Sequence, residues 1–238
     1  MVNLASAHWI IDLYGISQTV AEDPIRIGDF LSLVNARMFD YQGIVQLTPV
    51  LGDTAKPQNN GVSGLILFNG GHLTLHTFSQ RKVAFMDWCE TGPAGTADIE
   101  RRKAILDSLT EAEIRYERCV WCRDNEAEGF GCHFMAEMQY LPLNLATKVI
   151  VDVMDAIKMT ELARPIITLK GDNYSIIQPI TESHIAIHAQ KKGATLFDIF
   201  SCKNFDVDKV KQVFSMHNLS LGEECIVARG IYMQDKTL

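Results

Sequence analysis

The segment Tyr174–Cys202 reads YSIIQPITESHIAIHAQKKGATLFDIFSC and is the most informative part of the sequence about the fold. It contains two short apolar runs, at 183–188 and 194–200, separated by a Lys-Lys-Gly sequence. Runs of this length that are rich in β-branched and aromatic residues and bounded by turn residues predict buried β-strands. We therefore expect a hairpin here, which would bring a serine, a histidine and a cysteine thiol close together without a helix or a metal.

The same order of predicted elements occurs twice along the chain. In the first half the expected elements are a strand at 8–14, a helix at 23–38, strands at 43–51, 62–69, 71–78 and 82–88, a helix at 97–109 and a strand at 113–121. In the second half they are a strand at 133–140, a helix at 143–159, strands at 165–170, 174–180, 183–189 and 194–201, a helix at 206–217 and a strand at 222–228. Residue identities repeat as well, because Gly71–His76 aligns with Ser183–His188 at the offset that also places Ser63 on Ser175. Two copies indicate a duplication, since a solenoid would need three or more.

This duplication predicts the fold class and the domain organisation. We expect an N-terminal repeat at 1–124 and a C-terminal repeat at 132–238, each an α+β unit with an antiparallel sheet covered on one side by helices. The two sheets should pack face to face as a four-layer αββα sandwich. The fusion would make the chain an internal pseudo-dimer, and further assembly into a homo-oligomer stays open.

Length and composition bound the class of protein. The chain has 238 residues, of which 47% are hydrophobic, and no apolar run is as long as a membrane span, which predicts a soluble globular protein. The first residues lack a signal-peptide pattern, and six cysteines without one favour free thiols in the cytoplasm. A formal net charge of −7 with no basic stripe argues against nucleic acid as a partner and suits a small cationic substrate.

Three motifs carry a resemblance to a known family. They are Gly-Val-Ser-Gly at 61–64, Glu-Ser-His-Ile-Ala-Ile-His at 182–188 and Asp-Ile-Phe-Ser-Cys at 198–202. With the layout, which covers nearly the whole chain, they resemble the S-adenosylmethionine decarboxylase family, whose enzymes carry a self-generated pyruvoyl group. The family's small form is about one repeat long and works as a dimer. Its larger form is a fused duplication, and this chain resembles that form.

The resemblance implies that the chain cleaves itself between Glu182 and Ser183. In the family this bond breaks by an N→O acyl shift and β-elimination, which leaves the new chain, here 183–238, with a pyruvoyl group made from the serine. No side chain offers an electrophilic carbonyl, so an enzyme that needs an electron sink must bind a cofactor or make one. The pyruvoyl ketone would form a Schiff base with the substrate amine and accept the electrons released as CO2 departs.

The two repeats divide these roles unequally. The C-terminal repeat has Ser183 for the pyruvoyl group and Cys202 for the family's catalytic cysteine. The N-terminal repeat has glycine and threonine at the corresponding positions, but it keeps Ser63 and His76, the processing pair that the family draws from the facing unit. Because the losses and retentions are complementary, the resemblance implies one composite site and an inactive pseudo-symmetric mate.

Each candidate residue has an expected role in this chemistry. His76 is the candidate base for the α-proton of the ester intermediate, because an imidazole titrates near neutral pH. Ser63 is expected to hydrogen-bond the oxyoxazolidine intermediate. Cys202 is the expected acid that reprotonates the substrate carbon after CO2 leaves, since a thiol can donate and recover a proton. Glu182 flanks the scissile bond.

The sequence departs from the family pattern at positions expected to contact substrate. Pro57 stands where the family usually has an aromatic residue that stacks on adenine, and Gln80 stands where a glutamate bonds the ribose hydroxyls. The opening strand of the C-terminal repeat offers Glu137 and Tyr140 where a second aromatic residue is usual. Losing a stacking partner costs on the order of 1–3 kcal/mol, by analogy with base–aromatic stacking. Two substrate hypotheses follow: S-adenosylmethionine, the family default in spermidine synthesis, and alternatively ornithine or arginine.

Two other functional classes fit the sequence less well. A non-catalytic paralogue that regulates an active enzyme would explain a degenerate repeat, but all four candidate catalytic residues are intact. A serine hydrolase would need a G-x-S-x-G nucleophile elbow, which the sequence lacks.

A possible zinc pattern is formed by Cys119, Cys122, Cys132 and His133. Residues three apart on a strand point to opposite faces of the sheet, so the first two cysteines would not bind one metal ion together. We therefore expect structural cysteines and no metal site.

Overall fold

The computed structural model describes residues 6–40, 42–51, 59–91, 98–122, 131–181 and 183–230. These residues form two compact units, one made of Ala7–Cys122 and the other of Ser6 with the described residues after Cys122. Each unit contains a six-stranded sheet with helices packed on it. Among the described residues, no helix has the length and apolar character needed to cross a membrane.

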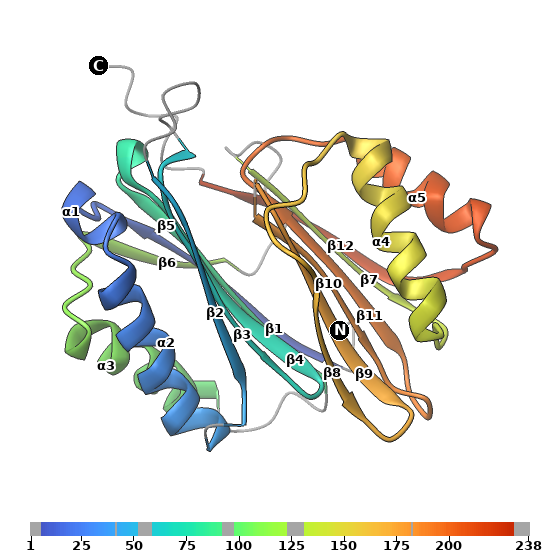
Figure 1. Ribbon diagram of the computed structural model, residues 1–238, viewed down its shortest axis with the longest axis horizontal. Helices are drawn as coiled ribbons and strands as arrows, with labels where there is room; N and C mark the ends of the chain where they lie inside the picture. The colour runs from blue at the N-terminus through green and yellow to red at the C-terminus, as the bar shows by residue number, and fades with distance from the viewer. Residues whose placement is uncertain are drawn as a thin grey trace. The chain divides into compact units, whose positions relative to one another are not determined.

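The sheet of the N-terminal unit has the strand order β2-β3-β4-β5-β1-β6. Its strands are β1 (Ser6–Tyr14), β2 (Ile44–Val50), β3 (Gly61–Phe68), β4 (Gly71–Phe78), β5 (Val83–Thr91) and β6 (Arg118–Cys122). Its helices are α1 (Gln18–Ala21), α2 (Pro24–Phe39) and α3 (Asp98–Glu111), and a 3-10 turn, η2 (Ser79–Arg81), joins β4 to β5. Helices α2 and α3 contact each other and lie on one face of this sheet (Figure 1).

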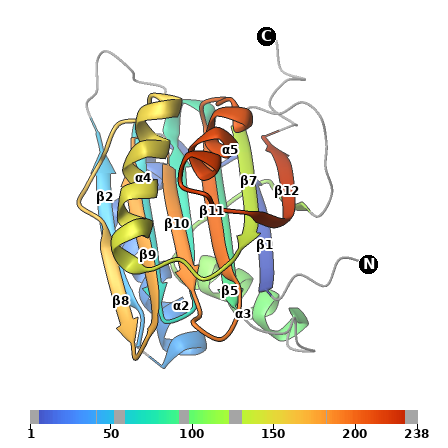
Figure 2. The same ribbon diagram turned by 90° about the vertical axis from the view of Figure 1, so that its right-hand side faces the viewer.

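The sheet of the C-terminal unit has the strand order β8-β9-β10-β11-β7-β12. Its strands are β7 (Gly131–Met138), β8 (Ile166–Lys170), β9 (Asn173–Ile180), β10 (Ser183–Ala189), β11 (Thr195–Ser201) and β12 (Leu221–Arg229). Its helices, α4 (Leu143–Ile157) and α5 (Val207–Met216), contact each other and cover one face of the sheet (Figure 2).

The two sheets share one topology. Replacing β1 to β6 by β7 to β12 in order converts the first strand order into the second. The register is shared as well, because Ser63 pairs with His76 between β3 and β4, and Ser175 pairs with His188 between β9 and β10. The predicted α+β class with two homologous repeats, each an antiparallel sheet with helices on one side, is confirmed. The face-to-face packing of the two sheets stays a prediction.

Each core lies between the helices and one face of the sheet. In the C-terminal unit, Ile185 and Ile187 of β10 and Phe197 and Ile199 of β11 pack in one cluster with apolar residues of α4 and α5. Successive strand residues point to opposite faces, so the intervening residues of β10 and β11 project away from the helices. The strands therefore present a second set of side chains on the helix-free face.

The Gly-Val-Ser-Gly motif is explained in part by helix packing. A Cβ added to Gly64 would lie 2.7 Å from Cδ1 of Leu31 and 3.0 Å from Cγ2 of Ile27, both on α2. Non-bonded carbon atoms prefer separations of about 3.5–4.0 Å, so only glycine allows α2 to lie this close to β3. Ser63, the neighbour of Gly64, consequently faces away from the helices.

Helices α1 and α2 begin directly after a residue whose side chain accepts a hydrogen bond from the first turn of the helix. Asp23 precedes Pro24 and its carboxylate accepts a hydrogen bond of 2.9 Å from the N–H of Ile25, which begins α2 near the predicted position. The short helix α1 was not expected from the sequence. It begins after Ser17, whose hydroxyl accepts a hydrogen bond of 3.3 Å from the N–H of Val20.

One predicted strand is shorter than expected. The strand predicted at 113–121 begins only at Arg118. The chain after α3 first closes a turn, in which Glu113 has a φ of 56° and the N–H of Ile114 donates a 2.9 Å hydrogen bond to the carbonyl of Leu109. A left-handed residue at the end of a helix satisfies helical carbonyl groups, and the alternating pattern of the sequence did not signal it.

Candidate active site

Ser183 is the first residue of β10, and its backbone has an unusual conformation. Its φ of 154° lies in a range that residues with a side chain rarely adopt; such conformations cost on the order of 1–3 kcal/mol and cluster at functional sites. The residue is buried, and its hydroxyl oxygen lies 3.2 Å from Nδ1 of His184. The serine thus combines a strained backbone with a positioned hydroxyl group.

A line of buried polar side chains continues from His184 across the sheet. Nε2 of His184 lies 2.9 Å from Oδ1 of Asp198, and Oδ2 of Asp198 lies 2.8 Å from Nε2 of His133. Nδ1 of His133 lies 3.2 Å from Nη1 of Arg229. Four neighbouring strands, β10, β11, β7 and β12, contribute one residue each. We call these four residues together with Ser183 the polar line.

Strand alternation and register explain why the polar line forms. On β10 and β11 the residues between the apolar core positions face away from the helices, and these include His184 and Asp198. His184 and His133 both pair with Phe200 of β11, so their rings extend from the two strands that flank Asp198. The guanidinium carbon of Arg229 lies 4.6 Å from the centre of the Phe200 ring, a cation–π distance that helps to hold this buried cation.

Cys202 directly follows β11 and is buried. Ser201, the residue before it, pairs with Ser183 in the register of β10 and β11. The hairpin therefore brings Ser183 and Cys202 to the same end of two paired strands, as the sequence predicted. The neighbouring β7 also approaches closely here, because a Cβ on Gly131 would lie 2.6 Å from the carbonyl oxygen of Ser201 and 3.3 Å from Cα of Cys202.

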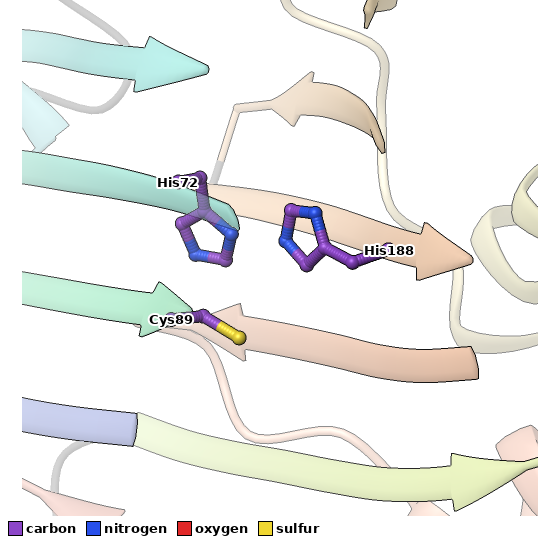
Figure 3. Close-up of side chains that lie close together, drawn as sticks. All are labelled: His72, Cys89 and His188. Carbon is purple, nitrogen blue, oxygen red and sulfur yellow. The ribbon is translucent and has the colours of Figure 1, made fainter. Parts of the chain in front are cut away.

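The predicted processing pair of the N-terminal unit is in hydrogen-bonding contact. Nδ1 of His76 lies 3.0 Å from the hydroxyl oxygen of Ser63. His76 is buried and Ser63 is half-buried, and both project from the helix-free face of their sheet. In the C-terminal unit, Ser175 and His188 occupy the same register, and the His188 ring extends from β10 (Figure 3).

The N-terminal unit contains a counterpart of the polar line that lacks the serine. Nε2 of His8 lies 2.5 Å from Oδ1 of Asp87, and Nε2 of His72 lies 3.5 Å from Oδ2 of Asp87. These residues come from β1, β5 and β4, the counterparts of β7, β11 and β10. His72 pairs in register with Cys89 of β5 (Figure 3). Gly71 precedes His72, so this unit has the histidines and the carboxylate but a glycine at the position equivalent to Ser183.

Restoring the serine of the N-terminal repeat, by Gly71→Ser, should destabilise the protein without creating a second cleavage site. A Cβ at Gly71 would lie 2.2 Å from the carbonyl oxygen of Cys89 and 2.6 Å from the Phe68 ring, and a backbone oxygen cannot move aside cheaply. We expect a loss of about 1–3 kcal/mol in the free energy of unfolding, measured by urea denaturation. Gly222→Ser on β12, where the added Cβ would lie 3.5 Å from its nearest neighbour, is the matched control and should be nearly neutral. A fully stable Gly71→Ser chain that is cut before residue 71 would contradict this account.

Gln80 is the predicted substrate-contacting residue of the N-terminal unit that the structure describes. Gln80 is exposed in the turn η2, close to the end of β4 and four residues after His76. Pro57 and Glu182 lie outside the described residues, so their assigned roles remain predictions.

The two substrate candidates of the C-terminal repeat differ in their surroundings. Glu137 is half-buried on β7, where it alternates with the core residues Ala136 and Met138 and so faces away from the helices, as the polar line does. Tyr140 lies beyond the end of β7 and donates a hydrogen bond of 3.0 Å to the carbonyl of Asp172. Of the two, Glu137 shares the sheet face of the candidate site.

The remaining cysteines considered for a metal site favour the protonated form. Burial raises the pKa of the Cys132 thiol to about 11, and burial with a smaller contribution from Asp12 raises that of Cys119 to about 11. Zinc binds the thiolate form of cysteine, so these environments oppose metal binding by these two thiols. Cys122 shares β6 with Cys119.

These raised pKa values predict slow alkylation of the folded protein. At pH 8 a thiol whose pKa is raised from 9.0 to about 11 holds roughly 100-fold less thiolate, so Cys119 and Cys132 should react with iodoacetamide about 100-fold more slowly than in urea. As pH rises, these two thiols ionise at a lower pH in the unfolded chain than in the folded chain. The free energy of unfolding should therefore be unaffected by them below pH 9 and fall between pH 9 and 11. Peptide mass spectrometry after timed alkylation measures the alkylation rates of the two cysteines. Equal rates in buffer and in urea would contradict the raised pKa values.

Sequence reasoning did not assign roles to four residues of the polar line, namely His133, His184, Asp198 and Arg229. A signal for two of them was present, because the pair His8 and Asp87 occupies the equivalent positions of the first repeat. Comparing the polar residues of both repeats strand by strand would have identified them. Arg229 carried the same kind of signal, because the repeat alignment places it on Arg123.

Comparisons with known proteins bear on this arrangement. The sequence model of the family described as S-adenosylmethionine decarboxylase matches residues 7–101 and 134–221, which together make up most of the chain. The chain belongs to the S-adenosylmethionine decarboxylase family. One matched segment lies in each unit, and membership of this family associates the chain with decarboxylase chemistry.

Solved structures similar to this family member are distant in sequence. The adenosylmethionine decarboxylase from Aquifex aeolicus VF5 is 15% identical with a TM-score of 0.39, and the match covers 47% of this chain and 100% of that chain. A putative glycine cleavage system transcriptional repressor is 6% identical with a TM-score of 0.25, covering 94% of this chain and 99% of that chain. A comparison with curated proteins found no match.

Proposed function

We propose that this chain is a self-cleaving, pyruvoyl-dependent decarboxylase of polyamine biosynthesis that acts on S-adenosylmethionine. The observation that carries the proposal is the state of Ser183, which has a strained φ of 154° and a buried hydroxyl directed at an imidazole. An N→O acyl shift relieves backbone strain and needs a hydroxyl that can lose its proton. The strained backbone and the positioned hydroxyl of Ser183 support both requirements at the peptide bond before this residue, where the family resemblance places the cleavage.

The residues around Ser183 suit a covalent pyruvoyl group. A ketone at this position would begin the chain at β10, held by the antiparallel pairing of that strand with β9 and β11. When present, the group supplies an electron sink for the carbanion that decarboxylation creates. The chain's own residues would then bind the substrate, exclude water and return a proton to its carbon.

Cys202 is the residue that we assign to this proton return. It is buried and lies at the same end of the β10–β11 pair as Ser183. We assign Ser63 and His76 to the processing reaction, and their hydrogen bond of 3.0 Å supports joint action as donor and base. The intact state of all four residues speaks against a non-catalytic paralogue.

Intact-protein mass spectrometry under denaturing conditions tests the proposal. The expected result is two fragments, 1–182 and 183–238, of which the smaller has no free amino group and reacts with a carbonyl reagent. A purified chain that remains whole after prolonged incubation would overturn the proposed self-cleavage.

The substrate is tested by CO2 release from carboxyl-labelled S-adenosylmethionine, ornithine and arginine. We expect release from S-adenosylmethionine. Release from ornithine or arginine alone would favour the alternative that the loss of the family's aromatic residue and glutamate at Pro57 and Gln80 suggests. A cleaved chain that is inactive on all three would overturn the decarboxylase assignment.

A further inference from the structure

We propose that His184 is the general base that removes the hydroxyl proton of Ser183 during self-cleavage, and that Asp198, His133 and Arg229 hold it in the required tautomer. This inference rests on the proposed self-cleavage and adds the residues that start it. It assigns a function to the polar line, which joins five residues of the C-terminal unit through contacts of 2.8–3.2 Å.

The tautomer of His133 is set by Arg229. A guanidinium group only donates hydrogen bonds, so Nδ1 of His133, 3.2 Å from Nη1 of Arg229, must accept and carries no proton. The proton of the neutral ring therefore sits on Nε2, which donates to Oδ2 of Asp198 at 2.8 Å. One oxygen of the Asp198 carboxylate is thus occupied by a fixed donor.

The tautomer of His184 is set by the other carboxylate oxygen of Asp198, Oδ1. An ionised carboxylate accepts hydrogen bonds only, so Nε2 of His184, 2.9 Å from Oδ1 of Asp198, must carry the ring proton. Nδ1 of the neutral His184 ring is then an acceptor, and it lies 3.2 Å from the hydroxyl oxygen of Ser183. The hydroxyl donates toward the imidazole, which is the direction of proton transfer that a nucleophilic serine requires.

The first step of self-cleavage balances with these groups alone. The hydroxyl oxygen of Ser183 bonds to the preceding carbonyl carbon while its proton moves to Nδ1 of His184. As the bond between that carbon and the Ser183 nitrogen breaks, the proton is returned to the nitrogen. The product is an ester with a free amine, and no external reagent is consumed. Asp198 stabilises the imidazolium ion that exists between the two transfers.

His184 is a catalytic residue in this account because it contacts the reacting oxygen, whereas Asp198, His133 and Arg229 are positioning residues. The step assigned to His184 precedes the one assigned to His76, which acts on the α-proton of the completed ester. The two histidines therefore make separable predictions about which intermediate accumulates.

Asp198→Asn is the decisive variant. Because Arg229 keeps the Nδ1 position of His133, the amide oxygen must accept from Nε2 of His133, and the amide NH2 must donate to Nε2 of His184. The ring proton of His184 then moves to Nδ1, which can no longer accept the serine proton. Removing general-base assistance should slow self-cleavage by about 10²–10⁴-fold in pulse-labelled protein.

Hydroxylamine separates this effect from a general structural defect. It cuts esters, so it should release fragments from His76→Ala, where the ester accumulates, but not from Asp198→Asn or His184→Ala, where the ester does not form. The matched control is Asp12→Asn, which alters a buried strand carboxylate of the N-terminal unit that belongs neither to the polar line nor to its counterpart, and which should be cleaved at close to the wild-type rate. Wild-type cleavage rates in Asp198→Asn and His184→Ala, or an ester that accumulates in them, would overturn the proposal.

A measurement on uncleaved protein tests the tautomer of His184 directly, without relying on a cleavage rate. In the Ser183→Ala chain, nitrogen-15 NMR should show His184 protonated at Nε2 and bare at Nδ1, and the added Asp198→Asn change should reverse this. A proton on Nδ1 in Ser183→Ala would overturn the inference. Failure of the wild-type chain to cleave would instead overturn the proposed function, while the NMR signature still reports on the polar line.

Discussion

The Ser183→Ala chain should remain a single polypeptide and release no CO2 from any substrate. Without the hydroxyl group there is no acyl shift, and without the shift there is no ketone to accept the electrons of decarboxylation. The effect should be total, because no other residue of the chain supplies an electrophilic carbonyl. Denaturing gel electrophoresis and radiometric CO2 assays measure both parts.

Ser175→Ala is the matched control for this variant, since Ser175 is also a buried strand serine, on the neighbouring β9. It should be cleaved and active. Residual CO2 release by uncleaved Ser183→Ala would mean that decarboxylation does not depend on the self-made group, and cleavage of that chain would place the reactive serine elsewhere.

Cys202→Ala should separate self-cleavage from turnover. Cys202 is assigned to protonation of the substrate carbon and not to the acyl shift, so the fragments should still form. Loss of a positioned acid should lower kcat by about 10²–10⁴-fold. Mass spectrometry of the fragments together with steady-state kinetics checks both statements on one preparation.

Cys225→Ala provides the comparison for Cys202, because Cys225 is a half-buried cysteine on β12 of the same unit. It should keep near wild-type kcat. Equal activity of the Cys202→Ala and Cys225→Ala proteins would remove the role of Cys202, while loss of cleavage in Cys202→Ala would move that role into processing.

Most helices and strands could be predicted from the sequence because short segments of neighbouring residues carry the signals for them. Strands β9 to β11 appear as short apolar runs with turn residues between them, and β4 is predicted by the same pattern. The helix α2 is predicted by Asp23 and Pro24. The delayed start of β6 could not be predicted, since it depends on how the chain closes the turn after α3.

The candidate site could be predicted only where the repeats differ visibly. Ser183 and Cys202 stand out because the first repeat has glycine and threonine in their places, and Ser63 and His76 stand out because they are retained. Their side-chain roles and the substrate remain proposals.

The two copies of one α+β unit can be recognised from the amino-acid sequence alone, as can the serine and the cysteine that one copy has where the other has glycine and threonine. The line that His133, Asp198 and His184 form next to that serine, and the position of Arg229 at its end, are seen only in the folded chain. These residues come from four strands whose order in the sheet differs from their order in the sequence. Strand order and register determine which side chains of neighbouring strands lie within hydrogen-bonding distance, and local sequence patterns do not encode either.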